Sequence, residues 1–203
     1  MNLFAFDNQY RTGEATLVCG VDEAGRGPLA GPVYAAAVIL PPDFVLPGLN
    51  DSKKLSAKKR EELFDVIVQE ALTFAIATAT EQEIDEYNIL NASLLAMERA
   101  VAGLTMPPDV ILIDGNKTPP NLPMAQAVVQ GDAKSAAIAA ASILAKVERD
   151  RAMELLDREY PAYQFARHKG YPTKLHYQML DEYGPSPVHR TSFLKKWESG
   201  KKP

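Results

Sequence analysis

The sequence contains very little cysteine and histidine. Its 203 residues include one cysteine, Cys19, and three histidines. An internal disulfide is therefore excluded, and too few ligands remain for a zinc site built from cysteine and histidine. Cys19 follows Leu17 and Val18 in an apolar run, where we expect a buried structural thiol rather than a nucleophile.

Long hydrophobic runs and a recognisable secretory signal are also missing. No apolar run approaches the roughly 20 residues that a membrane-spanning helix needs. The stretch from Met1 to Gly13 has no basic start followed by an apolar segment. We therefore expect a cytoplasmic protein. The length fits one domain, or one domain with a small appendage, that can bury a proper core.

A strong positive charge is absent as well, because the formal net charge is -4. The distribution is uneven: residues 164–203 carry eight Lys/Arg against three Asp/Glu, a net of +5 that leaves -9 for the rest. His168, His176 and His189 lie in the same segment. A basic segment beside an acidic body could lie along a phosphate backbone, but a solvated basic tail has the same composition. Charge alone leaves the partner undecided.

The apolar pattern predicts an α/β protein, with helices on the faces of a sheet. Strands are expected at residues 17–22, 33–40, 73–80, 110–113 and 125–129. Helices are expected from a cap at Ser56 to about Ala71, from about Ile89 to Gly103, and over residues 174–183 and 191–197. Residues 133–160, which contain neither glycine nor proline, are expected to form one long helix or two abutting ones. The last forty residues resemble an appendage more than a domain with its own core.

Acidic residues stand where predicted strands end. Asp22 ends the first strand, Asp114 ends the fourth, and Asp132 precedes the long helix. Each follows an apolar run, and a carboxylate at the edge of a core is costly unless a cation compensates for the lost hydration. Carboxylate oxygens favour magnesium or manganese. In α/β sheets, sites also gather at strand ends.

Two of these acids, taken singly, also fit ordinary structural roles. Asp132 could be the N-cap of its helix, and Asp114, which precedes Gly115 and Asn116, could start a turn. Asp22 and Glu23 fit such a role less well, because adjacent like charges after a buried strand repel each other without a cation. Together the three positions favour a metal site.

A glycine-rich stretch, residues 25–31, follows the first strand. A dinucleotide-binding turn is rejected because the spacing differs from G-x-G-x-x-G, Pro28 removes an amide, and two carboxylates stand beside the proposed anion. A backbone loop that must approach something closely accounts for the stretch better, although a simple turn stays open.

Six motifs in order resemble the bacterial ribonuclease HII family. They are Asp22-Glu23-Ala24-Gly25-Arg26-Gly27-Pro28-Leu29-Ala30-Gly31-Pro32-Val33, Asn50-Asp51-Ser52-Lys53-Lys54-Leu55, Ile113-Asp114-Gly115, Gly131-Asp132-Ala133-Lys134, the run from Ala141 to Val147 with Arg149-Asp150, and His168-Lys169-Gly170-Tyr171-Pro172-Thr173. The resemblance covers nearly the whole chain; residues before Leu17 and after Trp197 are outside it.

The resemblance implies a ribonuclease H-like fold, with a mixed five-stranded sheet flanked by helices. Residues 1–163 would form the catalytic domain, and residues 164–203 a helical basic appendage packed on it. It also implies endonucleolytic cleavage of RNA in RNA–DNA hybrids. Single ribonucleotides embedded in DNA would be cut on their 5′ side, leaving 3′-hydroxyl and 5′-phosphate ends. A role in removing ribonucleotides or replication primers from DNA follows. We expect a monomer.

The resemblance also implies roles for individual residues. Catalysis and the binding of two Mg²⁺ or Mn²⁺ ions fall to Asp22, Glu23, Asp114 and Asp132. Recognition of the junction between ribonucleotide and deoxynucleotide falls to Gly25, Arg26, Gly27 and Tyr171. Lys53 and Lys169 are candidate phosphate contacts, with a solvated lysine as the alternative.

These residue types suit that chemistry. Two magnesium ions about 4 Å apart can activate a water and stabilise the leaving oxygen. The 2′-hydroxyl, which distinguishes RNA from DNA, is both donor and acceptor. Glycines allow the backbone to approach it, and a tyrosine offers a ring and a hydroxyl.

Two rival functions remain. A structure-selective DNA nuclease could use the same acidic centre, but it would leave residues 25–27 and Tyr171 without a 2′-hydroxyl to recognise. A non-catalytic hybrid-binding module would be expected to lack one or more of the four carboxylates, and all four are present.

Overall fold

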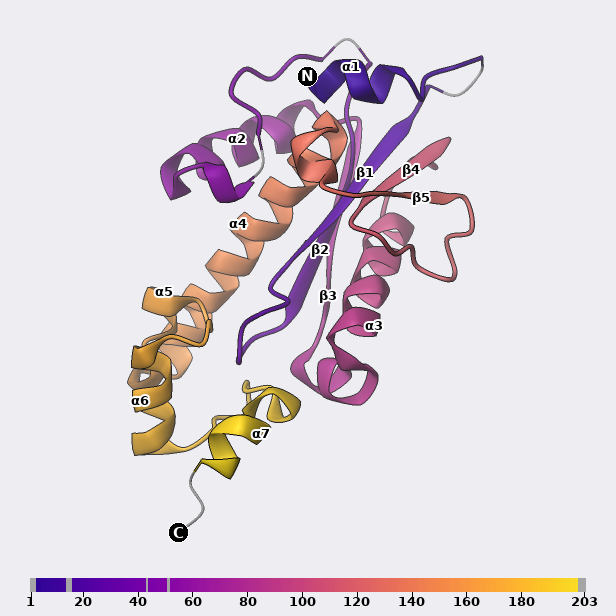
Figure 1. The fold of residues 1–203 in the computed structure, drawn as a ribbon. Coiled ribbons are helices and arrows are strands. Elements are labelled where there is room, and N and C mark those ends of the chain that lie inside the picture. The colour runs from indigo at the N-terminus through magenta and orange to yellow at the C-terminus, as the bar shows by residue number, and fades with distance from the viewer. Residues whose placement is uncertain (1–2, 14–15, 43, 51, 201–203) are drawn as a thin grey trace.

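A mixed five-stranded sheet forms the centre of the computed structural model, which describes residues 3–13, 16–42, 44–50 and 52–200 (Figure 1). The strands are β1 (Val18–Ala24), β2 (Val33–Ile39), β3 (Thr73–Ala79), β4 (Val110–Asp114) and β5 (Ala125–Val128), in the order β3-β2-β1-β4-β5. β1 pairs antiparallel with β2, and β2 with β3, whereas β1–β4 and β4–β5 are parallel. The predicted mixed sheet is confirmed.

The described helices are α1 (Leu3–Asn8), α2 (Ala57–Glu70), α3 (Glu81–Ala102), α4 (Ala136–Glu159), α5 (Phe165–His168), α6 (Lys174–Tyr183) and α7 (Thr191–Ser199). Short 3-10 turns occupy Ser52–Lys54, Gly131–Ala133 and Pro161–Tyr163. None of these helices is long and apolar enough to cross a membrane. Ser56 caps α2 as predicted, with its side chain accepting the Lys59 N–H.

Alternate residues of the central strands face different helices, as expected for a sheet covered on both sides. Ala36 and Val38 of β2 belong to the core formed with α2 and α4. Ala35 and Ala37 belong to the core formed with α3 on the other face. Figure 1 shows α4 and α3 on the two sides of the sheet.

Helix α4 lies very close to β1 because both contribute small residues. A Cβ atom added to Gly20 would lie 2.0 Å from the carbonyl carbon of Ala137. The first half of α4 is rich in buried alanines. Gly20 lies two residues before Asp22, and α4 begins four residues after Asp132. This contact therefore sets the distance between two of the acidic residues.

Helix α3 corrects a prediction, because it begins at Glu81 rather than near Ile89. Thr80 and Glu83 form a capping box at its start. Asn88 then interrupts the helix at φ 67°, and its side chain accepts the N–H groups of Leu90 and Asn91. The apolar residues that repeat at helical spacing predicted only the part of α3 after this kink. Before the kink, Ile84 is the one fully buried apolar residue.

The C-terminal helices share their apolar clusters with the rest of the molecule. Leu29, after β1, packs with Leu180 and Leu194 of α6 and α7. Met153 of α4 packs with Tyr163 and Phe165. Residues 164–200 therefore lie on the body, as an appendage would, whereas the boundary between residues 163 and 164 stays a prediction.

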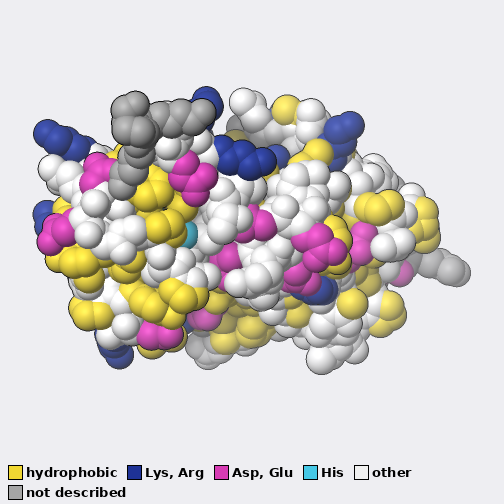
Figure 2. All heavy atoms as spheres, turned by 90° about the horizontal axis from the view of Figure 1, so that it is seen from below, with side chains coloured by type: hydrophobic (Ala, Val, Ile, Leu, Met, Phe, Trp, Pro, Cys, Tyr) yellow, Lys and Arg dark blue, Asp and Glu magenta, His cyan; other side chains and the backbone are white. Residues whose placement is uncertain are grey.

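The basic excess of this C-terminal segment does not form a separate surface on the face that Figure 2 displays. There, Lys/Arg and Asp/Glu side chains are interspersed. Arg190 is fully buried, and Lys169 forms an ion pair with Glu154. Lys201 and Lys202 lie outside the described residues.

Candidate active site

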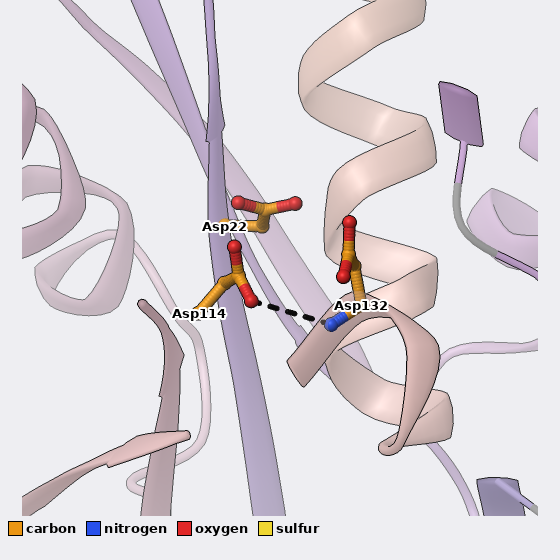
Figure 3. A group of neighbouring side chains, drawn as sticks. All are labelled: Asp22, Asp114 and Asp132. Carbon is orange, nitrogen blue, oxygen red and sulfur yellow. Dashed lines mark hydrogen bonds between the residues drawn. The ribbon is translucent and has the colours of Figure 1, made fainter. Parts of the chain in front are cut away.

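Three carboxylates from separate segments meet beside the sheet (Figure 3). Asp22 lies on β1 and Asp114 ends the adjacent parallel strand β4, where Val21 pairs with Ile113. Asp132 lies in the 3-10 turn before α4. Each offers an oxygen, and these oxygens all lie within 4.8 Å of one another. We call this group the acidic cluster.

Main-chain amides hold the acidic cluster in place. The Oδ1 atom of Asp114 accepts the Gly131 N–H at 2.6 Å and the Asp132 N–H at 3.4 Å, the bond drawn in Figure 3. Asp22 Oδ1 accepts the Glu23 N–H at 2.7 Å. The N-cap of α4 is Ser135, whose hydroxyl accepts the Ile138 N–H. The interpretation of Asp132 as that N-cap was therefore wrong.

The electrostatics of the acidic cluster favour an added cation. Asp22 is 3% exposed and Asp132 6%. Burial raises the pKa of Asp22 well above its ordinary value, and the charges of Glu23 and Asp114 raise it further. A set of close, buried carboxylate oxygens fits a hard divalent cation such as Mg²⁺ or Mn²⁺.

Glu23 stands beside the acidic cluster without belonging to it. Its side chain forms an ion pair with Arg26 at 3.3 Å and is 12% exposed. Burial raises the pKa of Glu23, and the guanidinium of Arg26 opposes that shift. The structure therefore brings three of the four predicted catalytic residues into one cluster and pairs the fourth with a predicted recognition residue.

A hollow of about 260 Å³ opens in front of these residues. We call it the site hollow, and its lining consists of Asp22, Glu23, Ala24, Gly25, Arg26, Gly27, Ser52, Lys53, Asp114, Ser142, Lys146 and Tyr171. All five predicted substrate-binding residues are among them. Lys53 is 78% exposed at its side chain, and its Nζ lies 3.3 Å from Asp132 Oδ2. Asp51, in the same motif, lies outside the described residues.

The two predicted recognition segments lie side by side in the lining of this hollow. A Cβ on Gly27 would lie 3.7 Å from the ring of Tyr171, which is 39% exposed. Gly25 has φ +103°, and a Cβ there would lie 2.1 Å from the Arg149 Nε. Both the conformation and the space at position 25 require glycine. Lys169 does not line the hollow, because its ammonium lies 2.8 Å from Glu154 on α4.

Sequence reasoning missed three polar residues of the hollow. Ser52 and Ser142 share a hydrogen bond of 2.7 Å between their hydroxyls. Lys146 forms an ion pair of 2.6 Å with Asp150, and burial lowers the pKa of Lys146. The sequence could have indicated two of them, because Ser142 and Lys146 are four residues apart and therefore lie on one face of α4. They interrupt a run of small apolar residues.

A chain of buried histidines holds the segment that carries Tyr171. The Nδ1 of His176 lies 3.0 Å from the carbonyl oxygen of Tyr171, so this nitrogen must donate. Its Nε2 then accepts from His189 Nε2 at 2.9 Å, and His189 Nδ1 accepts the Ser186 N–H at 3.0 Å. This pattern requires both rings to be neutral. The tail histidines are therefore structural in this fold rather than part of a solvated tail.

The neutral histidines predict that the protein loses stability in mild acid. Burial lowers the pKa of His176 and His189 to about 4. An unfolded histidine titrates near 6.5. Above that pH neither state gains a proton. Between about 6.5 and 4 only the unfolded state does, so the free energy of unfolding should fall, by on the order of 3 kcal/mol.

Urea unfolding at pH 7 and pH 5 measures this loss. His189→Gln is the matched variant, because it keeps a donor and an acceptor but removes one titrating ring, and it should show a smaller loss. Equal stability of the natural protein at both pH values would contradict the assignment of neutral rings. Buried carboxyls with raised pKa values, such as Asp22, act in the opposite direction, which makes the comparison between variants necessary.

Comparison with known proteins identifies relatives over most of the chain. The family model described as Ribonuclease HII matches residues 19–196. A ribonuclease HII from Marinomonas sp. (strain MWYL1) is 60% identical over 178 residues, which are 87% of this chain and 89% of the relative. One from Dechloromonas aromatica (strain RCB) is 58% identical over 177 residues, 87% of this chain and 90% of the relative. The crystal structure of the ribonuclease H2 from Pyrococcus horikoshii OT3 has a TM-score of 0.73 at 28% identity, covering 87% of this chain and 93% of that one.

Proposed function

Since the chain belongs to the ribonuclease HII family and is a type II ribonuclease H that acts on RNA–DNA hybrids, we propose that it also cleaves duplex DNA 5′ of single embedded ribonucleotides. The products would carry 3′-hydroxyl and 5′-phosphate ends. Such a reaction removes ribonucleotides from DNA, and we propose that role for the protein.

One observation carries the proposal. The acidic cluster and the pair formed by residues 25–27 and Tyr171 line or border a single hollow. Cleavage and recognition of the sugar can therefore occur on one bound duplex. A nuclease that ignored the 2′-hydroxyl would need only the acidic part of this arrangement.

The proposed cofactors are two divalent cations, Mg²⁺ or Mn²⁺. Asp22, Asp114 and Asp132 would hold them, with Glu23 as a fourth ligand once its carboxylate leaves Arg26. When bound, such ions supply an activated water and charge stabilisation for the leaving 3′-oxygen. The Gly131 and Asp132 amides keep Asp114 oriented for this role.

Recognition is proposed for residues 25–27 and Tyr171 in the lining of the same hollow. Main-chain groups of residues 25–27 would hydrogen-bond the 2′-hydroxyl, which only a ribonucleotide carries. The exposed ring of Tyr171 would stack on the adjacent sugar or base. Lys53, at the rim beside Asp132, would contact a backbone phosphate. We also propose that the active enzyme is a monomer.

Three duplexes of equal length test the proposed function: one with a single ribonucleotide, one all-DNA, and one RNA–DNA hybrid. With Mg²⁺, we expect a cut on the 5′ side of the single ribonucleotide, cleavage of the hybrid, and an intact all-DNA control. Cutting of all three would favour the structure-selective nuclease instead. Binding of the hybrid without cleavage of any duplex would favour the non-catalytic hybrid-binding module.

Tyr171→Ala should lower kcat/KM on the single-ribonucleotide duplex by about tenfold or more, because stacking on an aromatic ring contributes roughly 1–3 kcal/mol per base. Tyr171→Phe, which keeps the ring, should retain most of the activity. The main-chain oxygen that His176 binds is present in both variants, so the segment should stay in place. If Tyr171→Ala cleaved this duplex as fast as the natural protein, the ring would have no role at the junction.

A further inference from the structure

Arg190 is a buried arginine that joins the C-terminal segment to residues 25–31, which we call the glycine loop. It is 0% exposed and is the residue just before α7. Its Nε and Nη2 donate to the Gly31 carbonyl at 2.8 and 2.6 Å. Nη2 also donates to the Gly25 carbonyl at 2.7 Å, and Nη1 to the Arg26 carbonyl at 3.2 Å. Four of its five N–H donors are used in this way.

The partners of Arg190 are unusual for a buried charge. A buried guanidinium is costly to desolvate and is commonly paired with a carboxylate. In the described part of the chain, all four of its hydrogen bonds go instead to main-chain carbonyls of the glycine loop. The guanidinium therefore holds the backbone of that loop in one conformation.

Because the peptide bond is planar, these contacts also fix the direction of the neighbouring N–H groups. In a trans peptide, the C=O of one residue and the N–H of the next point in opposite directions, and the described chain contains no cis bond. With the carbonyls of Gly25 and Arg26 facing Arg190, the N–H groups of Arg26 and Gly27 face away from it. Residues 25–27 line the site hollow, whereas Arg190 does not.

Main-chain bonds from the same segment hold the rest of the glycine loop. The Arg190 N–H donates to the Leu29 carbonyl at 2.8 Å, and the Gly31 N–H donates to the Val188 carbonyl at 2.9 Å. The Leu29 N–H donates to the carbonyl of Gly170, the neighbour of Tyr171, at 2.8 Å. The glycine loop is therefore hydrogen-bonded both to the residues around Arg190 and to the segment that carries Tyr171.

We propose that Arg190 is a positioning residue that keeps the amides of Arg26 and Gly27 directed at the 2′-hydroxyl of the substrate. This inference rests on the proposed function of the glycine loop. Arg190 itself touches no reacting atom, so its loss should change discrimination between ribose and deoxyribose more than binding to the duplex as a whole.

The test compares dissociation constants for the single-ribonucleotide duplex and the all-DNA duplex. Both are measured by fluorescence anisotropy with Ca²⁺ in place of Mg²⁺. Arg190→Lys keeps the charge but loses the fork of donors. We expect its preference for the ribonucleotide duplex to fall by about tenfold, the loss of roughly one good hydrogen bond, while affinity for the all-DNA duplex changes less than about threefold.

Leu63→Ala is the stability control. Leu63 is a buried residue of α2, 2% exposed, and its truncation should lower the unfolding midpoint without touching the glycine loop. An Arg190→Lys protein that lost stability like this control but kept its preference would overturn the inference and leave Arg190 a structural residue only. If the natural protein itself preferred neither duplex, the proposed function would fail first, and this inference with it.

A measurement on the natural protein covers the case in which Arg190→Lys does not fold. The amide resonances of Arg26 and Gly27 should shift when the single-ribonucleotide duplex is added, and should shift less with the all-DNA duplex. Equal shifts with both duplexes would overturn the inference.

Discussion

Asp114→Asn is expected to slow cleavage by at least about 1000-fold. It removes one of the carboxylate charges that would hold the divalent cations, which contribute several kcal/mol to stabilising the transition state. The fold should survive the change. An asparagine keeps the oxygen that accepts the Gly131 N–H, and the loss of one charge relieves repulsion on buried Asp22. Stability at pH 7 should therefore be unchanged or slightly higher.

Asp109→Asn makes the same chemical change at the opposite end of β4. Asp109 is exposed, and its carboxylate accepts the N–H groups of Thr16 and Leu17. This control should cleave at nearly the natural rate. Single-turnover rates on the hybrid measure both variants, and an Asp114→Asn enzyme within about tenfold of the natural rate would remove Asp114 from the catalytic set.

Gly20→Ala is expected to reduce the free energy of unfolding by more than about 3 kcal/mol, because overpacking against backbone cannot be relieved by a rotamer change. The added Cβ would lie 2.0 Å from the Ala137 carbonyl carbon and 2.2 Å from the Ile138 nitrogen. To fit it, α4 must move away from β1. Asp132 would move with α4, so residual activity should fall as well.

Gly184→Ala separates this clash from the ordinary cost of replacing glycine. Gly184 has φ +73°, but a Cβ there would meet nothing within 4 Å. We expect about 1–3 kcal/mol from the conformation alone, because φ 73° with ψ -174° is a region that essentially only glycine adopts. Urea unfolding of both variants is the measurement. Equal losses at positions 20 and 184 would show that β1 and α4 can separate at little cost.

The sheet was predictable because its strands carry their own signals. β-branched and small apolar residues in short runs, ended by turn residues, predicted all five strands to within two residues at each end. Helix α1 was not predicted, because its contact with α4 depends on distant residues. There, the buried carboxylate of Asp7 accepts the Ala137 N–H. The start of α3 was missed because capping at Thr80, rather than an apolar stripe, begins it.

The acidic cluster was predictable in part for a similar reason. Asp22 and Asp114 each follow a buried strand, and adjacent parallel strands bring such residues together. The ion pair between Glu23 and Arg26 was not predicted, because the Glu23 carboxylate was expected to face the metal instead. Arg190 had no signal at all. Its partners are main-chain oxygens as far as 165 positions away, and no local pattern indicates them.

The binding of Mn²⁺ tests most directly whether the acidic cluster is a divalent-cation site. Mn²⁺ is titrated into the protein, and the free ion is followed by electron paramagnetic resonance. The natural protein should bind it, and Asp114→Asn should bind it at least about tenfold more weakly, with Asp109→Asn unchanged. Equal Mn²⁺ affinity of the natural protein and Asp114→Asn would contradict the site described here.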